Sequence, residues 1–159
     1  MKYVETKVTF REVPHEITLC INISNCPCKC EGCHSSYLAK DIGTVLDEES
    51  LELLIKGNHG ISTVAFMGGD ADPKTVNKLA GYVKKYHGGL KIAWYSGRQE
   101  IHPDIKVENF DFIKVGPYMK DKGPLTSTTT NQVFYKVVRL SGGKCKLFDI
   151  TYKFWNLND

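Results

Sequence analysis

Apolar and polar residues alternate at both ends of the chain. Near the start the alternation runs over residues 4–13 and again over 16–23, and near the end it runs over 133–140 and 144–152. A period of two residues predicts a strand with one buried face, and two such runs joined by a short turn predict a hairpin. We therefore expect an antiparallel hairpin at each end of the chain.

Between these hairpins the pattern changes to short, continuously apolar runs, at residues 63–67, 90–95 and 112–115. Runs of this kind are typical of strands that are buried on both faces of a parallel sheet. A long polar stretch, residues 119–131, follows the last run. We expect it to be an ordered loop, because long loops in compact domains are usually functional.

Two helices are predicted between these runs. The first begins after Asp47, which can act as an N-cap, and ends at Gly57. The second has Asp72 as its N-cap and Pro73 at its first position, and it ends at the glycine pair 88–89. A shorter helical segment is expected within residues 36–40. The alternation of strands and helices favours an α/β fold with a mainly parallel sheet.

Composition restricts the class of protein. A chain of 159 residues with 42% hydrophobic and 25% charged residues fits a single globular domain. Its net charge of +3 comes from scattered lysines, so we expect no nucleic-acid partner. No apolar stretch is long enough to span a membrane, and the start lacks the apolar core of a secretory signal. We expect a cytoplasmic protein without a membrane partner.

Four of the six cysteines lie within residues 26–33, directly after the first hairpin. They are too crowded to pair sensibly as disulfides, and crowded thiols in a reducing compartment more often bind metal. Cys26, Cys30 and Cys33 form a C-x3-C-x2-C triplet, with Cys28 as an extra thiol. The open alternatives are a closed zinc site that uses all four cysteines, and plain buried or redox-active thiols. Outside the stretch, Cys20 and Cys145 are interpreted as small core or edge residues.

The triplet resembles the cluster-binding signature of radical S-adenosylmethionine (SAM) enzymes. That resemblance implies a [4Fe–4S] cluster on Cys26, Cys30 and Cys33, whose fourth iron binds SAM. Reductive cleavage of SAM would then produce a 5′-deoxyadenosyl radical. The stretch Gly68-Gly69-Asp70 resembles the superfamily's Gly-Gly-Glu element, which binds the methionine amino group, with the shorter Asp in place of Glu.

Further SAM contacts are expected at the carboxyl ends of the parallel strands, where such sheets bind ligands. Ser96 is a candidate by its position, with a surface serine as the alternative interpretation. Lys114 could pair with the SAM carboxylate or line the edge of the sheet. Arg98 is interpreted as a surface charge or a partner contact.

A narrower resemblance is to the activating enzymes of anaerobic (class III) ribonucleotide reductase. It rests on the loop Cys30–His34, on residues 111–118 and on residues 127–132, which resemble that family's Ser-x-Thr-Thr-Asn-Gln stretch. Several relatives have Asp where this chain has Val115, so no role carries over to that position. The resemblance implies a glycyl-radical activating enzyme that abstracts hydrogen from a glycine of the reductase's catalytic subunit. A flavodoxin- or ferredoxin-type protein would donate the electron.

These features lead to an expected fold: an incomplete (β/α) barrel of the radical SAM type, with an open, curved, mainly parallel sheet and antiparallel hairpins at the termini. Residues 1–159 would form one domain with a core over about 17–140. The full eight-unit barrel typically needs about 250 residues, more than this chain has. Two other functions stay open: a radical SAM enzyme that acts on a small molecule, as deazapurine synthases do, and a non-catalytic zinc-binding interaction module.

Overall fold

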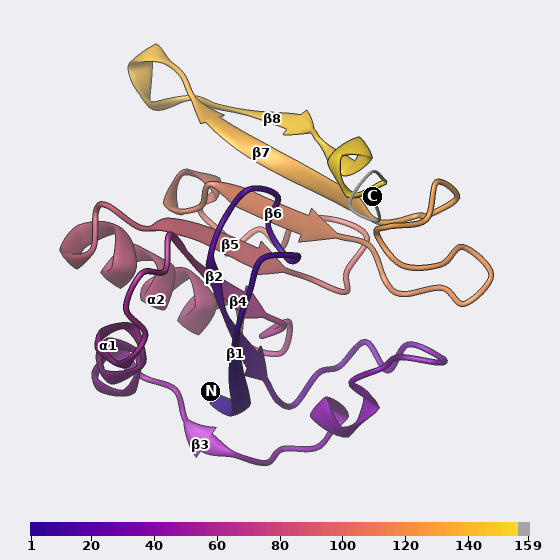
Figure 1. Ribbon diagram of the computed structural model, residues 1–159, viewed down its shortest axis with the longest axis horizontal. Helices are drawn as coiled ribbons and strands as arrows, with labels where there is room; N and C mark the ends of the chain where they lie inside the picture. The colour runs from indigo at the N-terminus through magenta and orange to yellow at the C-terminus, as the bar shows by residue number, and fades with distance from the viewer. Residues whose placement is uncertain (156–159) are drawn as a thin grey trace.

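The computed structural model of the chain describes residues 1–155, so the last four residues of the expected domain lie outside it. One eight-stranded sheet organises the fold, in the order β3-β1-β2-β4-β5-β6-β7-β8 (Figure 1). The strands are β1 (Lys2–Thr9), β2 (Thr18–Ile23), β3 (Thr44–Val45), β4 (Thr63–Met67), β5 (Lys91–Tyr95), β6 (Phe112–Val115), β7 (Val133–Arg139) and β8 (Cys145–Asp149). The four central strands, β2, β4, β5 and β6, run parallel, and the outer pairs are antiparallel.

Two α-helices cover one face of this sheet. Helix α1 (Glu48–Gly57) begins in a capping box between Asp47 and Ser50, and α2 (Pro73–Tyr86) begins at Asp72, whose side chain accepts from the Thr75 N–H. Each cap satisfies backbone N–H groups that the first turn leaves unpaired. The helices pack through their apolar faces onto Leu19, Phe66 and Trp94 and their neighbours in the sheet. This is the larger of the two cores.

Loops cover the opposite face, which we call the loop-covered face. Cys20, Ala65, Ala93 and Phe112 stand in register across its centre. Its cover consists of Val13, Leu125 and Phe154, from three segments far apart in the sequence. The next row toward the carboxyl ends is Asn22, Met67, Tyr95 and Lys114. The central row includes two small alanines, and the next row includes the polar side chains of Asn22 and Lys114.

The structure confirms the α/β class, with a mixed open sheet that is parallel at its centre and has antiparallel hairpins at both ends. Strands β4 and β6 and the N-caps of both helices are as predicted. The β2–β4 and β4–β5 crossovers each contain an α-helix. The β5–β6 connection contains a short 3-10 helix (Val107–Asn109) instead. No helix within residues 1–155 is long and apolar enough to cross a membrane.

The main differences from the prediction are two strand ends and one unforeseen strand. Strand β1 ends at Thr9 rather than continuing to residue 13, because Val13 turns inward to cover the sheet. Strand β8 ends at Asp149 rather than at residue 152, because the chain then forms a 3-10 helix (Thr151–Phe154) that buries Phe154. In both cases tertiary packing overrides a local alternating pattern. The short edge strand β3 was not foreseen, whereas the short helix expected within residues 36–40 is present as a 3-10 helix (Ser36–Ala39).

Candidate functional site

Three of the predicted site residues meet at the carboxyl edge of the parallel strands. Asp70 follows β4, Ser96 follows β5, and Lys114 lies near the end of β6; all three are buried. The Ser96 hydroxyl donates to Asp70 Oδ1 at 2.6 Å, and Lys114 Nζ donates to the Ser96 carbonyl at 3.2 Å. The structure therefore brings these side chains from three strands into one polar cluster.

Asp70 is the centre of this cluster. Besides the Ser96 bond, its Oδ2 accepts the Gly97 N–H at 2.9 Å, and the Cys28 Sγ lies 3.8 Å from the same oxygen. Arg98 donates to the Asp70 carbonyl at 2.9 Å, and its Nε lies 3.8 Å from Oδ1. Arg98 is thus an ion-pair partner of Asp70, although its side chain is partly exposed. Both carboxylate oxygens already accept hydrogen bonds, so Asp70 ties β4 to β5 and to the cysteine loop.

Lys114 is held in place by two backbone carbonyls, those of Ser96 and Gly116. Burial lowers the pKa of its ammonium group to about 8, while the negative charge of Asp70 and of the nearby cysteines acts in the opposite direction. Ser96, whose carbonyl accepts from Lys114, also donates through its hydroxyl to Asp70, so the ammonium group belongs to the same polar cluster as that carboxylate.

The two residues before Asp70 need to be glycines because of their backbone conformation and their close neighbours. Gly68 and Gly69 both have positive φ (102° and 87°), a conformation that side chains disfavour. A Cβ on Gly69 would lie 2.4 Å from a methyl carbon of Val76 in α2. Gly69 also lines a cavity of about 270 Å³ together with Met1, Asn25 and Asp72.

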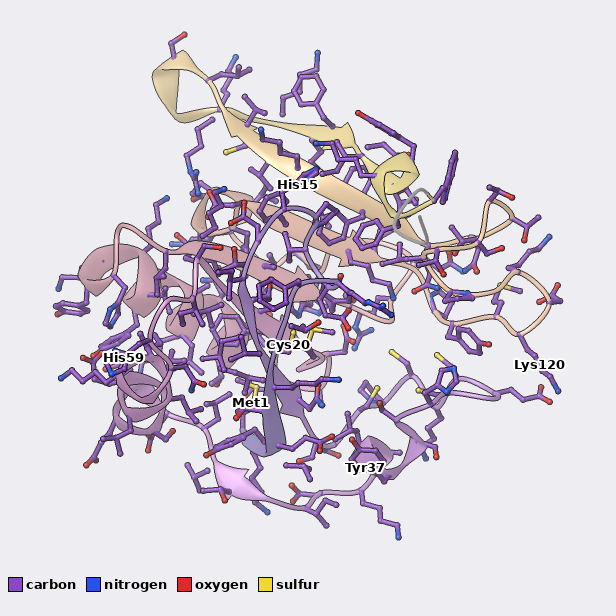
Figure 2. All side chains as sticks on the ribbon, viewed as in Figure 1. Met1, His15, Cys20, Tyr37, His59 and Lys120 are labelled. Atoms are coloured by element: carbon purple, nitrogen blue, oxygen red, sulfur yellow. The ribbon has the colours of Figure 1, made fainter. Side chains whose placement is uncertain are left out.

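The cysteine loop, residues 25–35, leaves the end of β2 and is anchored at both ends. Cys26 N–H donates to the Leu38 carbonyl at 2.9 Å, and Asn25 N–H donates to the Lys40 carbonyl at 3.0 Å. Tyr37, on the 3-10 helix after the loop and labelled in Figure 2, donates to Glu5 of β1. These contacts fix the loop against the edge of the sheet without using any thiol.

The four cysteines of the loop form two sets that share Cys26: one set is Cys26, Cys30 and Cys33, and the other is Cys26 and Cys28. Cys26, Cys30 and Cys33 line a single cavity of about 180 Å³. Cys28 is not among the residues that line it, because its thiol faces Asp70 and Gly97. Between Cys28 and Cys30 stands Lys29, with φ of 45°, a left-handed conformation that is uncommon for a residue other than glycine.

Cys26 also lies beside Cys28. Their two sulfur atoms and one carboxylate oxygen of Asp70 all lie within 4.8 Å of one another. A hydrogen bond from Cys28 lowers the pKa of the Cys26 thiol to about 6, and the same bond raises that of Cys28. Cys28 has one proton and two acceptors around it, the Cys26 sulfur and the Asp70 carboxylate. The lowered pKa favours the thiolate form of Cys26, which is the form that binds metals.

A third cavity, of about 460 Å³, adjoins the cysteine loop on the loop-covered face. It is lined by Cys33 and His34 from the loop, by Met67 and Tyr95 at the ends of β4 and β5, and by Gln132. Sequence reasoning did not single out Met67, Tyr95 or Gln132 as site residues. Met67 and Tyr95 could have been identified from the sequence, because they are the last residues of β4 and β5 and the alternation of side chains along a strand places them on this face.

The long loop before β7 lies beside the cysteine loop, and both extend on the same side of the sheet in Figure 1. The rings of His34 and Tyr118 have centroids 6.2 Å apart, and a Cβ on Gly32 would lie 3.6 Å from the Tyr118 ring. Within the loop, Asn131 donates to the Pro117 carbonyl at 2.9 Å. The segments that carry the narrower resemblance are thus close in space: residues 30–34, Tyr118 and residues 127–132.

The other two cysteines lie away from this loop in the sequence and differ in setting. Cys20, labelled in Figure 2, is buried in β2, and burial raises its pKa to about 12. Cys145 begins the edge strand β8, half-buried against the larger core. Both positions agree with the interpretation of core and edge residues.

Comparison with known proteins adds no identification: no family model matches the chain, and neither a curated protein nor a solved structure shows significant similarity to it.

Proposed function

We propose that the protein is a radical SAM enzyme, and that it activates an anaerobic ribonucleotide reductase. The observation that carries the proposal is the division of the cysteine loop. Cys26, Cys30 and Cys33 line one cavity at the carboxyl edge of a parallel sheet, while Cys28 faces Asp70. The triplet in the sequence and the triplet around the cavity are the same three residues.

The donor set fits a [4Fe–4S] cluster. Thiolates are the ligands that iron–sulfur clusters take, and three of them leave one iron open. A [4Fe–4S] cluster held by these three residues would supply, when reduced and with SAM bound, one-electron cleavage of the sulfonium C–S bond of SAM to a 5′-deoxyadenosyl radical. The low pKa of Cys26 favours the ligating form of that residue at neutral pH.

The remaining site residues have roles that this chain's geometry supports. Lys114 contributes positive charge near the cysteines. Asp70, held by Ser96 and Gly97, keeps the ends of β4 and β5 in a fixed relation, and Gly68 and Gly69 permit close backbone approach there. We propose Gly68, Gly69, Asp70, Ser96 and Lys114 as the SAM-contacting set. The cavity on the loop-covered face, with Met67 and Tyr95, is where a substrate group would lie beside the cysteine loop.

A protein substrate suits the exposed end of this site. The cysteine loop and the loop after β6 stand together at one side of the sheet, and Met119 and Lys120 there are exposed. A loop of the reductase's catalytic subunit, presenting its glycine, would enter between them. A flavodoxin- or ferredoxin-type donor would supply the electron.

The test is anaerobic and has two stages. Protein reconstituted with iron and sulfide is chemically reduced in the presence of SAM, and the 5′-deoxyadenosine that forms is quantified. A colourless protein that leaves SAM intact would reject both enzyme hypotheses. The catalytic subunit of an anaerobic ribonucleotide reductase from the same organism is then added, and electron paramagnetic resonance is recorded for a glycyl radical. SAM cleavage without a glycyl signal would reject the activase and favour a radical SAM enzyme with a small-molecule substrate, for which the cavity of about 460 Å³ has the usual size.

One observation favours the zinc-binding alternative: the proximity of Cys26, Cys28 and Asp70. This set is not the four-cysteine site that the sequence suggested, since it replaces Cys30 and Cys33 by a carboxylate. Protein that holds zinc tightly, takes up no iron and cleaves no SAM would favour an interaction module.

A further inference from the structure

We propose that Cys26, Cys28 and Asp70 form a second metal site, for a single Zn²⁺ ion, that shares Cys26 with the cluster site. Two thiol sulfurs and a carboxylate oxygen lie within 4.8 Å of one another. Thiolate sulfur and carboxylate oxygen are both common zinc ligands. The site is distinct from the cavity of Cys26, Cys30 and Cys33, because Cys28 is directed to the other side of the loop.

The spacing of the ligand atoms fits a tetrahedral ion. Zinc–sulfur bonds of about 2.3 Å and zinc–oxygen bonds of about 2.0–2.2 Å place neighbouring ligand atoms about 3.5–3.8 Å apart. The Cys28 Sγ lies 3.8 Å from Asp70 Oδ2. Small side-chain rotations would therefore bring the set to ligating distances, with water as the fourth ligand.

The surroundings of Asp70 are those of a supported ligand. Ser96 and the Gly97 N–H already orient its carboxylate, as outer hydrogen bonds commonly orient metal ligands. Each carboxylate oxygen has two acceptor sites, so Oδ2 keeps one beside the Gly97 bond. Gly97 is also needed for space: a Cβ there would lie 2.7 Å from the Cys28 sulfur.

Charge balance is also favourable. Two thiolates and a carboxylate carry three negative charges, and Zn²⁺ leaves one. The Arg98 guanidinium, with Nε 3.8 Å from Asp70 Oδ1, offsets it. On binding, any proton still carried by Cys26 or Cys28 passes to solvent and a sulfur–zinc bond forms at each residue, so no oxidant or reductant is needed.

Sharing Cys26 makes the two metal sites mutually exclusive, a consequence that rests on the proposed function. A zinc ion would withhold Cys26 from the cluster and hold the loop against β4 and β5. The chain would then be kept from assembling its cluster wherever zinc is available and iron is not.

The experiment titrates metal-free, reduced full-length protein with Zn²⁺ under anaerobic conditions, and with Co²⁺ to observe thiolate-to-metal absorption. We expect one ion per chain in the wild type. Cys28→Ala should weaken Zn²⁺ binding at least about tenfold and reduce the thiolate band, because it removes a direct ligand. Cys30→Ala and Cys33→Ala are the matched controls and should keep the affinity within about twofold.

A competition experiment tests the shared residue. Zinc-loaded wild type should take up iron and sulfide more slowly than metal-free wild type, and Cys28→Ala should lose this difference. No tight Zn²⁺ binding in the wild type would overturn the proposal, as would unchanged binding in Cys28→Ala or equal losses in Cys30→Ala and Cys33→Ala. The zinc titrations do not depend on cluster assembly, so failure of the proposed function is observed separately, as absent SAM cleavage.

Discussion

The Ser96 hydroxyl donates a 2.6 Å hydrogen bond to Asp70 Oδ1, and both side chains are about 1% exposed. The bond joins the ends of two parallel strands, 26 positions apart in the chain. Removing the hydroxyl leaves a buried carboxylate oxygen short of a partner, which costs more than the bond itself contributes.

Ser96→Ala should therefore lower the free energy of unfolding by about 1–3 kcal/mol, measured by urea denaturation. Ser141→Ala, at an exposed position in the last hairpin, is the control and should change stability by no more than about 0.5 kcal/mol. A Ser96→Ala variant as stable as the control would mean that Asp70 does not depend on this bond.

Gly97 should not tolerate a side chain. A Cβ there would lie 2.7 Å from the Cys28 sulfur and 3.0 Å from its Cβ. Overpacking of this kind typically costs about 1–3 kcal/mol, so Gly97→Ala should be destabilised by that amount. Gly89→Ala, where nothing lies within 4 Å, should be nearly neutral.

Combining Gly97→Ala with Cys28→Ala tests the contact directly. The second change removes the sulfur and relieves the closer of the two clashes, so the losses should be less than additive in a double-mutant cycle. Fully additive losses would contradict the position assigned to Cys28.

Acid should weaken the contact between the two helices. Hydrogen bonds from His87 and Lys56 lower the pKa of Glu52 in α1 to about 2, from an ordinary value near 4.5. A carboxyl whose pKa is lower in the folded state stabilises the fold above the ordinary pKa, and this contribution is lost as pH falls toward 2. Unfolding free energies measured between pH 7 and pH 2.5 should fall less steeply in Glu52→Gln than in the wild type.

Glu49→Gln removes a charge from the exposed side of the same helix and serves as the control. It should follow the wild-type pH profile. If both variants follow it, the Glu52–His87 pair does not contribute to stability.

Local chemistry made much of the fold predictable. Asp47, Asp72 and Pro73 mark helix starts through bonds and dihedral preferences that span only a few residues. The apolar runs of β4 and β6 are buried on both faces, so their limits were visible in the sequence. The failures are at the ends of β1 and β8, where the predicted alternation stops early and the chain turns to place Val13 and Phe154 over the sheet.

The sequence predicted where the site lies, but not which of its side chains contact one another. That Asp70, Ser96 and Lys114 share one edge follows from parallel strands. That Cys28 faces Asp70 depends on a contact across 42 positions and on the missing side chain of Gly97, which no local pattern encodes. The closeness of Arg98 to Asp70 has the same origin, since the two follow neighbouring strands.

The central claim is that three particular cysteines hold the cluster, and iron content after anaerobic reconstitution with iron and sulfide tests it most directly. We predict about four irons per chain and a cluster signal in electron paramagnetic resonance for the wild type and for Cys28→Ala. Cys26→Ala, Cys30→Ala and Cys33→Ala, each checked for folding by circular dichroism, should lose both. Equal loss in all four variants, or a cluster that survives in any of those three, would contradict the account.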